Sequence, residues 1–290
     1  MRRPLLSGPR RPVGLPEPLA SLDRTAVMGI LNVTPDSFSD GGLHNAPEAA
    51  VAHARLLRDQ GADLIDLGGE STRPGAEPVD EEEELRRVMP VVRALVADGA
   101  VLSIDTMHAA VAEAVIAEGV GIINDVSGGL ADPAMPATTA RLRTRRGEPP
   151  VMIAMHWRGP DVRRHTTYTD VAREVREELG AALRALVEAG VERERLVADP
   201  GLGFSKAAAQ DWELLAHWDE LEAHDLPVLI GASRKRSMGS LGVDRDQVTA
   251  AVSMHSALHG AWAVRVHEAA PSAAAARAAR ALAQAGSRRG

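Results

Sequence analysis

Short apolar runs alternate with longer amphipathic stretches along most of the chain. The runs are rich in Val, Ile and Leu and stop at Gly or a polar residue, which is typical of buried parallel strands. The strands are expected at residues 26–31, 64–67, 101–104, 121–123, 151–155, 196–198, 228–230 and 263–266. The helices are expected at residues 46–60, 80–97, 109–118, from Asp132-Pro133 onward, 168–189, 212–224, 247–259 and 272–285.

This pattern amounts to eight β–α units with short connections. Such alternation indicates a parallel sheet, and eight units in ~250 residues fit a closed (β/α)8 TIM barrel of the α/β class. A doubly wound open sheet is the alternative. It is disfavoured because no Gly-x-Gly-x-x-Gly follows the first strand, and Gly201-Leu-Gly203 is only a partial match. We expect one barrel domain over residues 22–290, preceded by a flexible extension over residues 1–21.

Composition narrows the class of protein. The chain has 290 residues, 45% hydrophobic and 25% charged, which is ordinary for a globular protein. A formal net charge of −7 argues against a nucleic-acid partner, and no apolar run approaches the ~20 residues that a membrane span needs. The lack of cysteine excludes disulfides, thiolate catalysis and Cys-ligated metal, and it fits a cytoplasmic location. The first 23 residues lack the apolar core of a secretory signal.

The basic residues are divided unusually between Arg and Lys. Of 33 basic residues only Lys206 and Lys235 are lysine, and the only two phenylalanines, Phe38 and Phe204, each lie in a Gly-rich loop. Lys presents a compact point charge and Arg a flat fork, so a site that needs the former cannot accept the latter. We interpret these rare residues as functional candidates, and their chance placement is the simpler alternative.

A first group of candidates lies at predicted strand ends, where a barrel builds its active site. Three of them, Asp105, Asn124 and Asp199, directly follow apolar runs and should lie near the barrel axis. A buried carboxylate needs a partner, because an unpaired one is costly. Together with Lys235 they offer the donors and acceptors that a flat heterocycle requires. The residues expected to form apolar walls beside it are Met155 and Phe204.

A second group combines hydroxyls, guanidinium groups and an imidazole, which suits a phosphate. Its members are Asn32, Ser71, Thr72, Arg73, Arg265 and His267. The amide oxygen of Asn32 is a ligand that Mg²⁺ accepts alongside substrate phosphates. Each residue alone has a plainer explanation, since a single His on a strand is more often structural and a single Arg more often a surface charge.

Seven motifs, in chain order, resemble those of the dihydropteroate synthases. The two longest are Met28-Gly-Ile-Leu-Asn-Val-Thr-Pro-Asp-Ser-Phe-Ser-Asp-Gly-Gly42 and Asp66-Leu-Gly-Gly-Glu-Ser-Thr-Arg-Pro-Gly-Ala76. The others are Ser103-Ile-Asp-Thr106, Asn124-Asp-Val-Ser-Gly-Gly129, Asp199-Pro-Gly-Leu-Gly-Phe204, Gly231-Ala-Ser-Arg-Lys235 and Arg265-Val-His267. The resemblance covers residues 27–267, and Met155-His-Trp-Arg-Gly159 resembles actinobacterial members.

The resemblance implies a transferase of folate biosynthesis. Such an enzyme joins 7,8-dihydropterin-6-ylmethyl diphosphate to 4-aminobenzoate, giving 7,8-dihydropteroate and diphosphate, with Mg²⁺ as metal. It implies small-molecule substrates, sensitivity to sulfonamides, and a homodimer that pairs through late helices, where residues 254–262 are apolar.

The resemblance also assigns roles to single residues. It implies that the pterin is held by Asp105, Asn124, Asp199, Lys235, Arg265, Met155 and Phe204. Diphosphate is expected at Asn32, Thr72, Arg265 and His267, with Mg²⁺ near Asn32. The first two loops are expected to fold over the site, so that the aminobenzoate pocket comprises Phe38, Arg73, Pro74, Ser233 and Lys235. The expected catalytic residues are Asp105, Lys235, Asn32 and Arg73, because diphosphate departs readily once its charge is neutralised and a carboxylate can stabilise the cation left behind.

The chain departs from the family pattern at Asp211, Arg236, Ser237 and Glu268. These departures bear on substrate affinity and sulfonamide response more than on reaction type. Two alternatives stay open. One is a pterin-dependent methyltransferase barrel, which should lack the Ser-Thr-Arg-Pro loop and the Lys235 and His267 elements. The other is a non-catalytic paralogue that keeps the fold as a binding protein.

Overall fold

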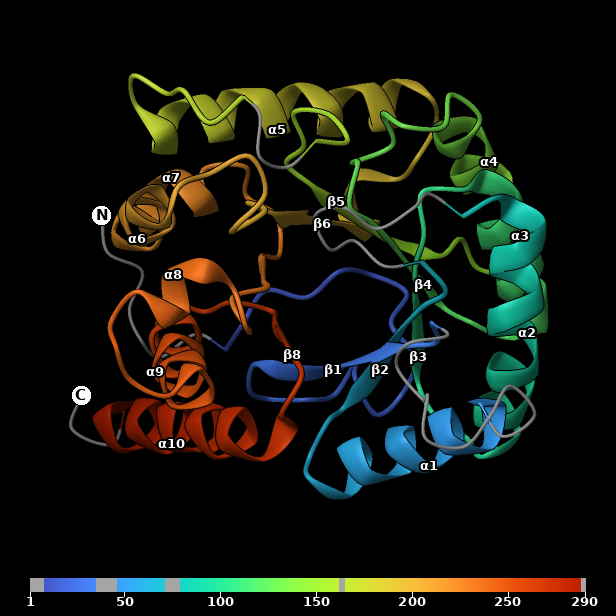
Figure 1. Cartoon of the computed structure of the whole chain (residues 1–290), viewed down its shortest axis with the longest axis horizontal. Coiled ribbons are helices and arrows are strands. Elements are labelled where there is room, and N and C mark those ends of the chain that lie inside the picture. The colour runs from blue at the N-terminus through green and yellow to red at the C-terminus, as the bar shows by residue number, and fades with distance from the viewer. Residues whose placement is uncertain (1–7, 35–45, 71–78, 162–164, 288–290) are drawn as a thin grey trace.

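The computed structural model describes residues 8–34, 46–70, 79–161 and 165–287, and it shows a ring of parallel strands surrounded by helices (Figure 1). The strands are β1 Ala26–Asn32, β2 Leu64–Gly68, β3 Leu102–Asp105, β4 Ile122–Asp125, β5 Val151–Met155, β6 Leu196–Asp199, β7 Leu229–Ile230 and β8 Ala263–Val266. They pair in the order β6-β5-β4-β3-β2-β1-β8-β7, and a parallel bridge between Ala198 and Val228 joins the two ends. The ring confirms the predicted (β/α)8 barrel.

The helices follow the strands in the predicted alternation. They are α1 Ala46–Asp59, α2 Glu81–Ala97, α3 Ala109–Glu118, α4 Met135–Arg141, α5 Val171–Glu188, α6 Ala208–Ala216, α7 Trp218–Glu222, α8 Arg236–Gly239, α9 Arg245–Leu258 and α10 Ala269–Ser287. Within the described ranges, no helix is long and apolar enough to cross a membrane.

Two helix predictions need correction. The single helix expected over residues 212–224 is two helices, because His217 has non-helical dihedral angles (φ −100°, ψ 60°). The helix expected from Asp132 begins at Met135. The Asp132 carboxylate accepts the backbone N–H groups of Ala109 and Ala134, both at 2.8 Å, so this residue ties the loop to α3 instead of opening a helix.

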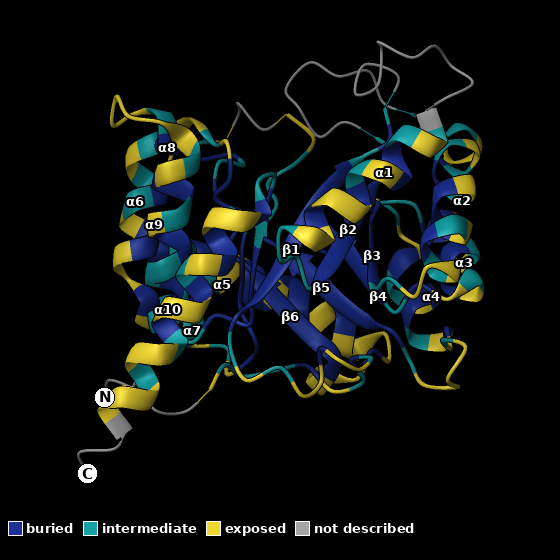
Figure 2. Ribbon diagram, turned by 90° about the horizontal axis from the view of Figure 1, so that it is seen from below, coloured by how far each residue is buried: buried dark blue, intermediate teal, exposed yellow. Residues whose placement is uncertain are grey.

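Strand side chains alternate between two apolar clusters. Residues such as Leu31 and Ile104 pack against the helices, whereas residues such as Met28 and Val197 pack inside the barrel. Successive side chains point to opposite faces of a strand, so inward positions recur every second residue. On β1, β3, β4, β6 and β8 the inward row therefore continues past the apolar residues to a polar side chain near the carboxyl end, whereas on β5 it ends on Met155. Figure 2 shows these buried strands at the centre of the molecule.

The segment before β1 closes the amino end of the barrel. Leu15 and Leu19 are 5% and 2% exposed, and both pack in the inner cluster that also contains Trp262. The flexible extension expected over residues 1–21 is therefore wrong for this part of the chain, because the two leucines fill the apolar opening of the barrel. Residues 1–7 lie outside the described part.

Candidate active site

The inward polar residues meet at the carboxyl end of the barrel. Strand register places Asn32 beside Gly68, Gly68 beside Asp105 and Asp105 beside Asn124. On the next strands Met155 lies beside Asp199. We call the inward residues of this rim the carboxyl-end cluster: Asn32, Asp66, Asp105, Asn124, Met155, Asp199, Ser233, Lys235, Arg265 and His267.

Arg265 joins two carboxylates at the centre of the cluster. Its Nε donates to Asp66 Oδ2 at 2.6 Å and its Nη2 to Asp105 Oδ2 at 2.5 Å. The Asn124 amide also donates to Asp66 Oδ2, at 2.9 Å. Asp66 is fully buried and Asp105 is 7% exposed. Charge-assisted contacts of this kind fix the guanidinium in position.

Asp66 is a site residue that the sequence reasoning missed. It stands inside the apolar run of β2 and is inward-facing, two residues after Leu64 of the inner cluster. The sequence did contain a signal that could have identified Asp66. It is a lone carboxylate inside an apolar strand, and such a group must have a buried partner.

Burial controls the charge of the cluster. It raises the pKa of Asp105 to about 7, although the nearby Arg265 guanidinium acts in the opposite direction. Burial likewise raises the pKa of Asp199. Burial disfavours the charged guanidinium of Arg265, but the two carboxylates beside it outweigh this and keep its pKa above the usual value. The Arg265 cation is thus permanent, whereas the pKa of Asp105 lies near neutral pH.

Lys235 enters the cluster from the turn after β7. The preceding Arg234 adopts a left-handed conformation (φ 59°), and its guanidinium contacts Glu268 Oε1 at 3.2 Å. Lys235 Nζ lies 3.9 Å from the centroid of the Phe204 ring, a cation–π contact. Its methylenes face Gly203, where an added Cβ would lie 2.7 Å from Lys235 Cδ. Burial lowers the pKa of Lys235 to about 8, and repulsion by the Arg265 cation adds to this shift.

Ser233 and His267 form a pair at the rim. Ser233 Oγ lies 3.0 Å from His267 Nδ1 and accepts the backbone N–H of His267 at 3.2 Å. A Ser233 hydroxyl that donates to Nδ1 would place the proton of a neutral imidazole on Nε2. An N–H donor at this rim suits an anionic group.

Asn32 is the described residue whose amide oxygen could hold a magnesium ion together with substrate phosphates. A Cβ on Gly68 would lie 3.6 Å from Asn32 Oδ1 and 3.5 Å from Asp105 Cβ, so the glycine keeps the gap between them clear. Among the described residues no group of three or more His, Cys, Asp or Glu side chains gathers in a metal-binding arrangement. One amide oxygen with substrate phosphates and water is a coordination that Mg²⁺ accepts.

The structure therefore brings together ten of the predicted and newly found residues, with Phe204 at their edge. The predicted residues Phe38, Thr72, Arg73 and Pro74 lie outside the described part of the chain. Their roles, and most of the aminobenzoate pocket, stay predictions.

A closed (β/α)8 barrel that carries a buried carboxylate–guanidinium–amide floor and a donor-lined rim at its carboxyl end defines a pterin-binding barrel enzyme. The family model described as "Pterin binding enzyme" matches residues 28–267. The dihydropteroate synthase of Mycobacterium leprae is 46% identical over 261 residues, which cover 86% of this chain and 90% of that protein.

Two solved structures of the Xanthomonas albilineans dihydropteroate synthase are similarly close. The structure with 4-aminobenzoic acid is 44% identical, with a TM-score of 0.82 over 90% of this chain and 93% of that one. The complex with 7,8-dihydropteroate is 42% identical, with a TM-score of 0.79 over 90% and 94%. The chain belongs to the dihydropteroate synthase family, as its motifs predicted.

Proposed function

We propose that the carboxyl-end cluster binds the pterin diphosphate and stabilises the cation formed when diphosphate departs. The enzyme is a transferase that joins 7,8-dihydropterin-6-ylmethyl diphosphate to 4-aminobenzoate. The observation that carries the proposed division of roles is the Arg265 guanidinium, which holds Asp66 and Asp105 together beside Asn124.

The floor of the cluster is complementary to the edge of a pterin, which alternates N–H and C=O or ring-nitrogen groups. Asp199 Oδ1 is engaged by the Gly201 N–H at 2.8 Å, which directs Oδ2 toward a ligand donor. The amide nitrogen of Asn124 faces Asp66, so its oxygen faces the opposite way as an acceptor. Lys235 supplies a donor, and the buried Met155 side chain supplies an apolar wall.

The charges of the floor suit a dissociative reaction. Asp66, Asp105 and Asp199 are three carboxylates beside the two cations Lys235 and Arg265, so full ionisation leaves the floor negative. The carbon–oxygen bond breaks with its electron pair going to diphosphate, which leaves positive charge on the pterin methylene and ring. The amine of 4-aminobenzoate then attacks that carbon and releases a proton. Asp105, poised next to Arg265, is the group we assign to cation stabilisation.

The leaving group is assigned to the rim. His267, Arg265 and the predicted Thr72 offer donors for diphosphate oxygens, and Asn32 would hold Mg²⁺. A bound Mg²⁺ would neutralise charge that develops on diphosphate. The predicted aminobenzoate pocket extends from Ser233 and Lys235 toward Phe38, Arg73 and Pro74, and sulfonamides are expected to compete there.

The test is diphosphate release by the purified full chain with both substrates and Mg²⁺. Release that depends on 4-aminobenzoate, with dihydropteroate detected by mass, supports the proposal. We expect Arg265→Met to abolish it. Arg280→Met is the matched control, because Arg280 pairs with Asp23 on the surface, its Nη2 lying 2.9 Å from Asp23 Oδ2. Pterin binding without release would instead indicate a non-catalytic paralogue.

We also propose that the protein acts in the cytoplasm as a homodimer. The lack of cysteine supports a reducing compartment. An apolar groove of about 560 Å³ supports pairing, and it lies between α6 and α9. Leu241 and Val243 line it and are both 56% exposed. Of the predicted residues 254–262, His255 lines this groove, whereas Trp262 is buried in the barrel interior.

A further inference from the structure

Lys206, the other lysine of the chain, lies buried beside the carboxyl-end cluster and is not part of it. Its side chain is 1% exposed, and its Nζ makes three contacts. It donates to the carbonyl oxygens of Gly201 and Phe204, both at 3.0 Å, and lies 2.9 Å from His156 Nδ1. An ammonium has three N–H donors, so these contacts use them all. Burial lowers the pKa of Lys206 to about 7.

The loop that Lys206 spans is an irregular turn between β6 and α6. Gly201, Gly203 and Ser205 all have left-handed backbones, with φ values of 68°, 73° and 49°. Ser205 is not a glycine, so its conformation needs outside support. The Lys206 amine supplies it by holding two carbonyls within the turn. Asp211 adds a contact from α6 by accepting the Gly203 N–H at 2.8 Å.

The same turn touches two residues of the carboxyl-end cluster. The Gly201 N–H donates to Asp199, and the Phe204 ring lies over the Lys235 ammonium. The two carbonyls that Lys206 holds belong to these same residues, Gly201 and Phe204. Movement of the turn would therefore displace the partners of both Asp199 and Lys235.

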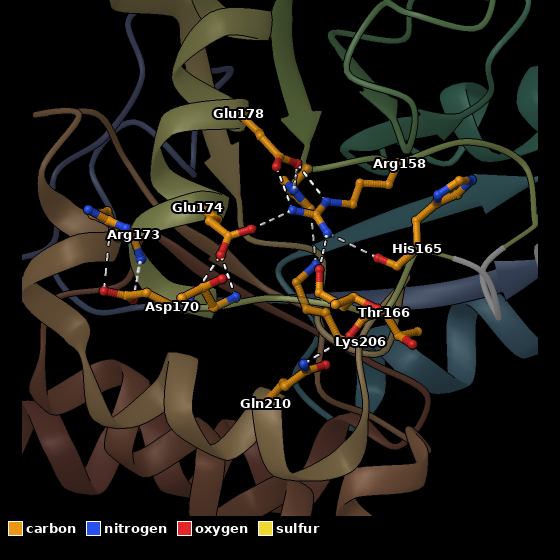
Figure 3. A network of polar contacts seen from close by, with 12 residues as sticks. Arg158, His165, Thr166, Asp170, Arg173, Glu174, Glu178, Lys206 and Gln210 are labelled. Atoms are coloured by element: carbon orange, nitrogen blue, oxygen red, sulfur yellow. Dashed lines mark hydrogen bonds and ion pairs between the residues drawn. The ribbon is translucent and has the colours of Figure 1, made fainter.

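A second set of contacts anchors Lys206 to helix α5. His156 Nε2 lies 2.9 Å from Glu178 Oε2, and Arg158 donates to Glu178 through Nε at 2.8 Å and Nη2 at 2.5 Å. The carboxylate requires a proton on His156 Nε2, which leaves Nδ1 to accept from Lys206. Burial and the Lys206 charge lower the pKa of His156 to about 4, which agrees with a neutral ring. Figure 3 shows Lys206 close to the Arg158–Glu178 pair.

Arg158 extends this anchor into the loop after β5. It donates to the carbonyls of His165 and Thr167, at 3.1 Å and 2.9 Å, and its Cζ lies 3.7 Å from the centroid of the Tyr168 ring. Two loops at the carboxyl end are thus tied to one helix through a continuous chain of charged and polar groups. This anchor reaches the carboxyl-end cluster through the backbone N–H of His156, which donates to the Asp199 carbonyl at 2.9 Å.

We propose that Lys206, held by His156 and Glu178, is a positioning residue that fixes the β6–α6 turn so that Phe204 and Asp199 engage Lys235 and the pterin. This inference rests on the proposed function of the cluster. It explains why the chain keeps a lysine here, since a planar guanidinium cannot place three donors on targets around one atom.

The test compares Lys206→Met, which removes the donors at similar volume, with Thr25→Val. Thr25 is buried and donates to the Ala261 carbonyl at 2.7 Å, beyond the amino end of β8. Both variants should lower Tm. Only Lys206→Met should raise KM for the pterin diphosphate, by roughly tenfold, because misplacing a binding group by a fraction of an ångström has effects of this order. In a Phe204→Ala background the Lys206→Met change should add little to KM.

Two readouts do not depend on turnover. Imidazole ¹⁵N shifts should show the Nε2–H tautomer of His156 in both proteins, with the Nδ1 resonance shifted in Lys206→Met because its hydrogen bond from the Lys206 amine is lost. Calorimetric titration with 6-hydroxymethylpterin should show the same weakening as KM. A shifted Nδ1 resonance and weaker pterin binding in a protein that releases no diphosphate would support Lys206 while refuting the proposed function.

An unchanged KM and pterin affinity in Lys206→Met would overturn the proposal. The proposal would also be overturned if Lys206→Met raised KM by the same factor in the Phe204→Ala background as in the wild type. If Lys206→Met does not fold, Glu178→Ala decides the matter, because Glu178 is partly exposed and holds His156 from outside. A smaller rise in KM is then expected, and an unchanged value would equally count against the inference.

Discussion

Three carboxylates and two cations share the inner rim of one barrel, and their mutual contacts decide what each can do. Arg265 is committed to Asp66 and Asp105, so it cannot turn away when substrate arrives. Lys235 has a different setting, since its ammonium faces an aromatic ring and not a carboxylate at bonding distance. Lys235 can therefore bind a ligand without giving up a carboxylate partner, and we expect ligand binding to depend on the compact shape of its ammonium.

Replacing Lys235 tests that dependence. We expect Lys235→Met to lose pterin and aminobenzoate binding with little change in Tm, because a partly desolvated ammonium contributes little to folding. We expect Lys235→Arg to lose roughly a hundredfold in kcat/KM as well, since the stem is confined by Gly203 and the guanidinium cannot reach the same point. Steady-state kinetics and differential scanning calorimetry check both. Full activity in Lys235→Arg would contradict the argument from the rarity of lysine.

We expect Asp105 to make the reaction pH-dependent. The role proposed for it, stabilising a cation, requires its ionised form, and its pKa is raised to about 7 by burial. We therefore expect kcat/KM for the pterin diphosphate to fall on the acid side of pH 7, since this parameter follows ionisations of the free enzyme. Asp105→Asn should be far less active and should lack that limb. A wild-type profile that is flat from pH 5 to 8 would refute the assignment.

The same ionisation has a consequence for stability. The pKa rises from 3.8 to about 7 on folding, so the folded protein binds this proton more tightly than the unfolded chain. The contribution of Asp105 to the free energy of unfolding is fully present below pH ~4, and it is lost as the pH rises through about 7. Between pH 5 and pH 8 the urea midpoint of the wild type should therefore fall relative to that of Asp105→Asn. A constant difference would show that Asp105 is already ionised at pH 5.

At the scale of elements, the β6–α6 turn shows how backbone geometry supports the site. Gly203 and Gly147 both have left-handed backbones, with φ of 73° and 79°. An added Cβ meets Lys235 at the first and nothing within 4 Å at the second. Alanine at either position should lower the free energy of unfolding by about 1 kcal/mol, because its Cβ strains a left-handed backbone. Only Gly203→Ala should also have a lower kcat/KM, because Lys235 must move to make room for the Cβ. Chemical denaturation measures the loss of stability, and steady-state kinetics measure the loss of activity.

Equal kinetic losses in the two glycine variants would show that the turn affects activity through global stability alone. Gly147 is a stringent comparison because its loop lies between α4 and β5, at the opposite end of the barrel from the carboxyl-end cluster. A kinetic loss confined to Gly203→Ala would place the effect in local contact with Lys235.

The elements also show what the sequence can predict. Strand and helix order followed from the alternation of apolar and amphipathic stretches, and Asp105, Asn124 and Asp199 were found because each directly follows an apolar run. Asp66 was missed because it sits one pair before the strand end. Lys206 was noticed by its rarity, but its role depends on His156, which is distant in sequence and meets it only in the folded barrel.

Helix ends and the amino-terminal segment were harder to predict for the same reason. His217 interrupts a stretch whose hydrophobic pattern is continuous, and only backbone angles reveal the break. Leu15 and Leu19 look like part of a polar, proline-rich tail until the open end of the barrel is there to receive them. Long-range contacts determine the structure of these two segments, and the local sequence pattern does not reveal such contacts.

At the scale of the whole molecule, the two ends and one side of the barrel have distinct roles. The amino end is closed by the segment before β1, the carboxyl end carries the chemistry, and the side formed by α6 and α9 bears the apolar groove. In Figures 1 and 2 this side lies across the barrel from α2 and α3. The separation means that pairing through the groove would leave both carboxyl ends open to substrate.

Val243→Glu tests pairing through this groove. A charge at a 56% exposed apolar position that must be desolvated in a dimer is expected to weaken association by several kcal/mol, whereas in the monomer it remains hydrated. Leu56→Glu on α1 is the matched control, since Leu56 is 50% exposed and does not line the groove. Light scattering should give twice the chain mass of 30.7 kDa for the wild type and Leu56→Glu, and the chain mass for Val243→Glu. Monomeric wild type would refute the homodimer. A dimer that survives Val243→Glu but not Leu56→Glu would move the interface to α1.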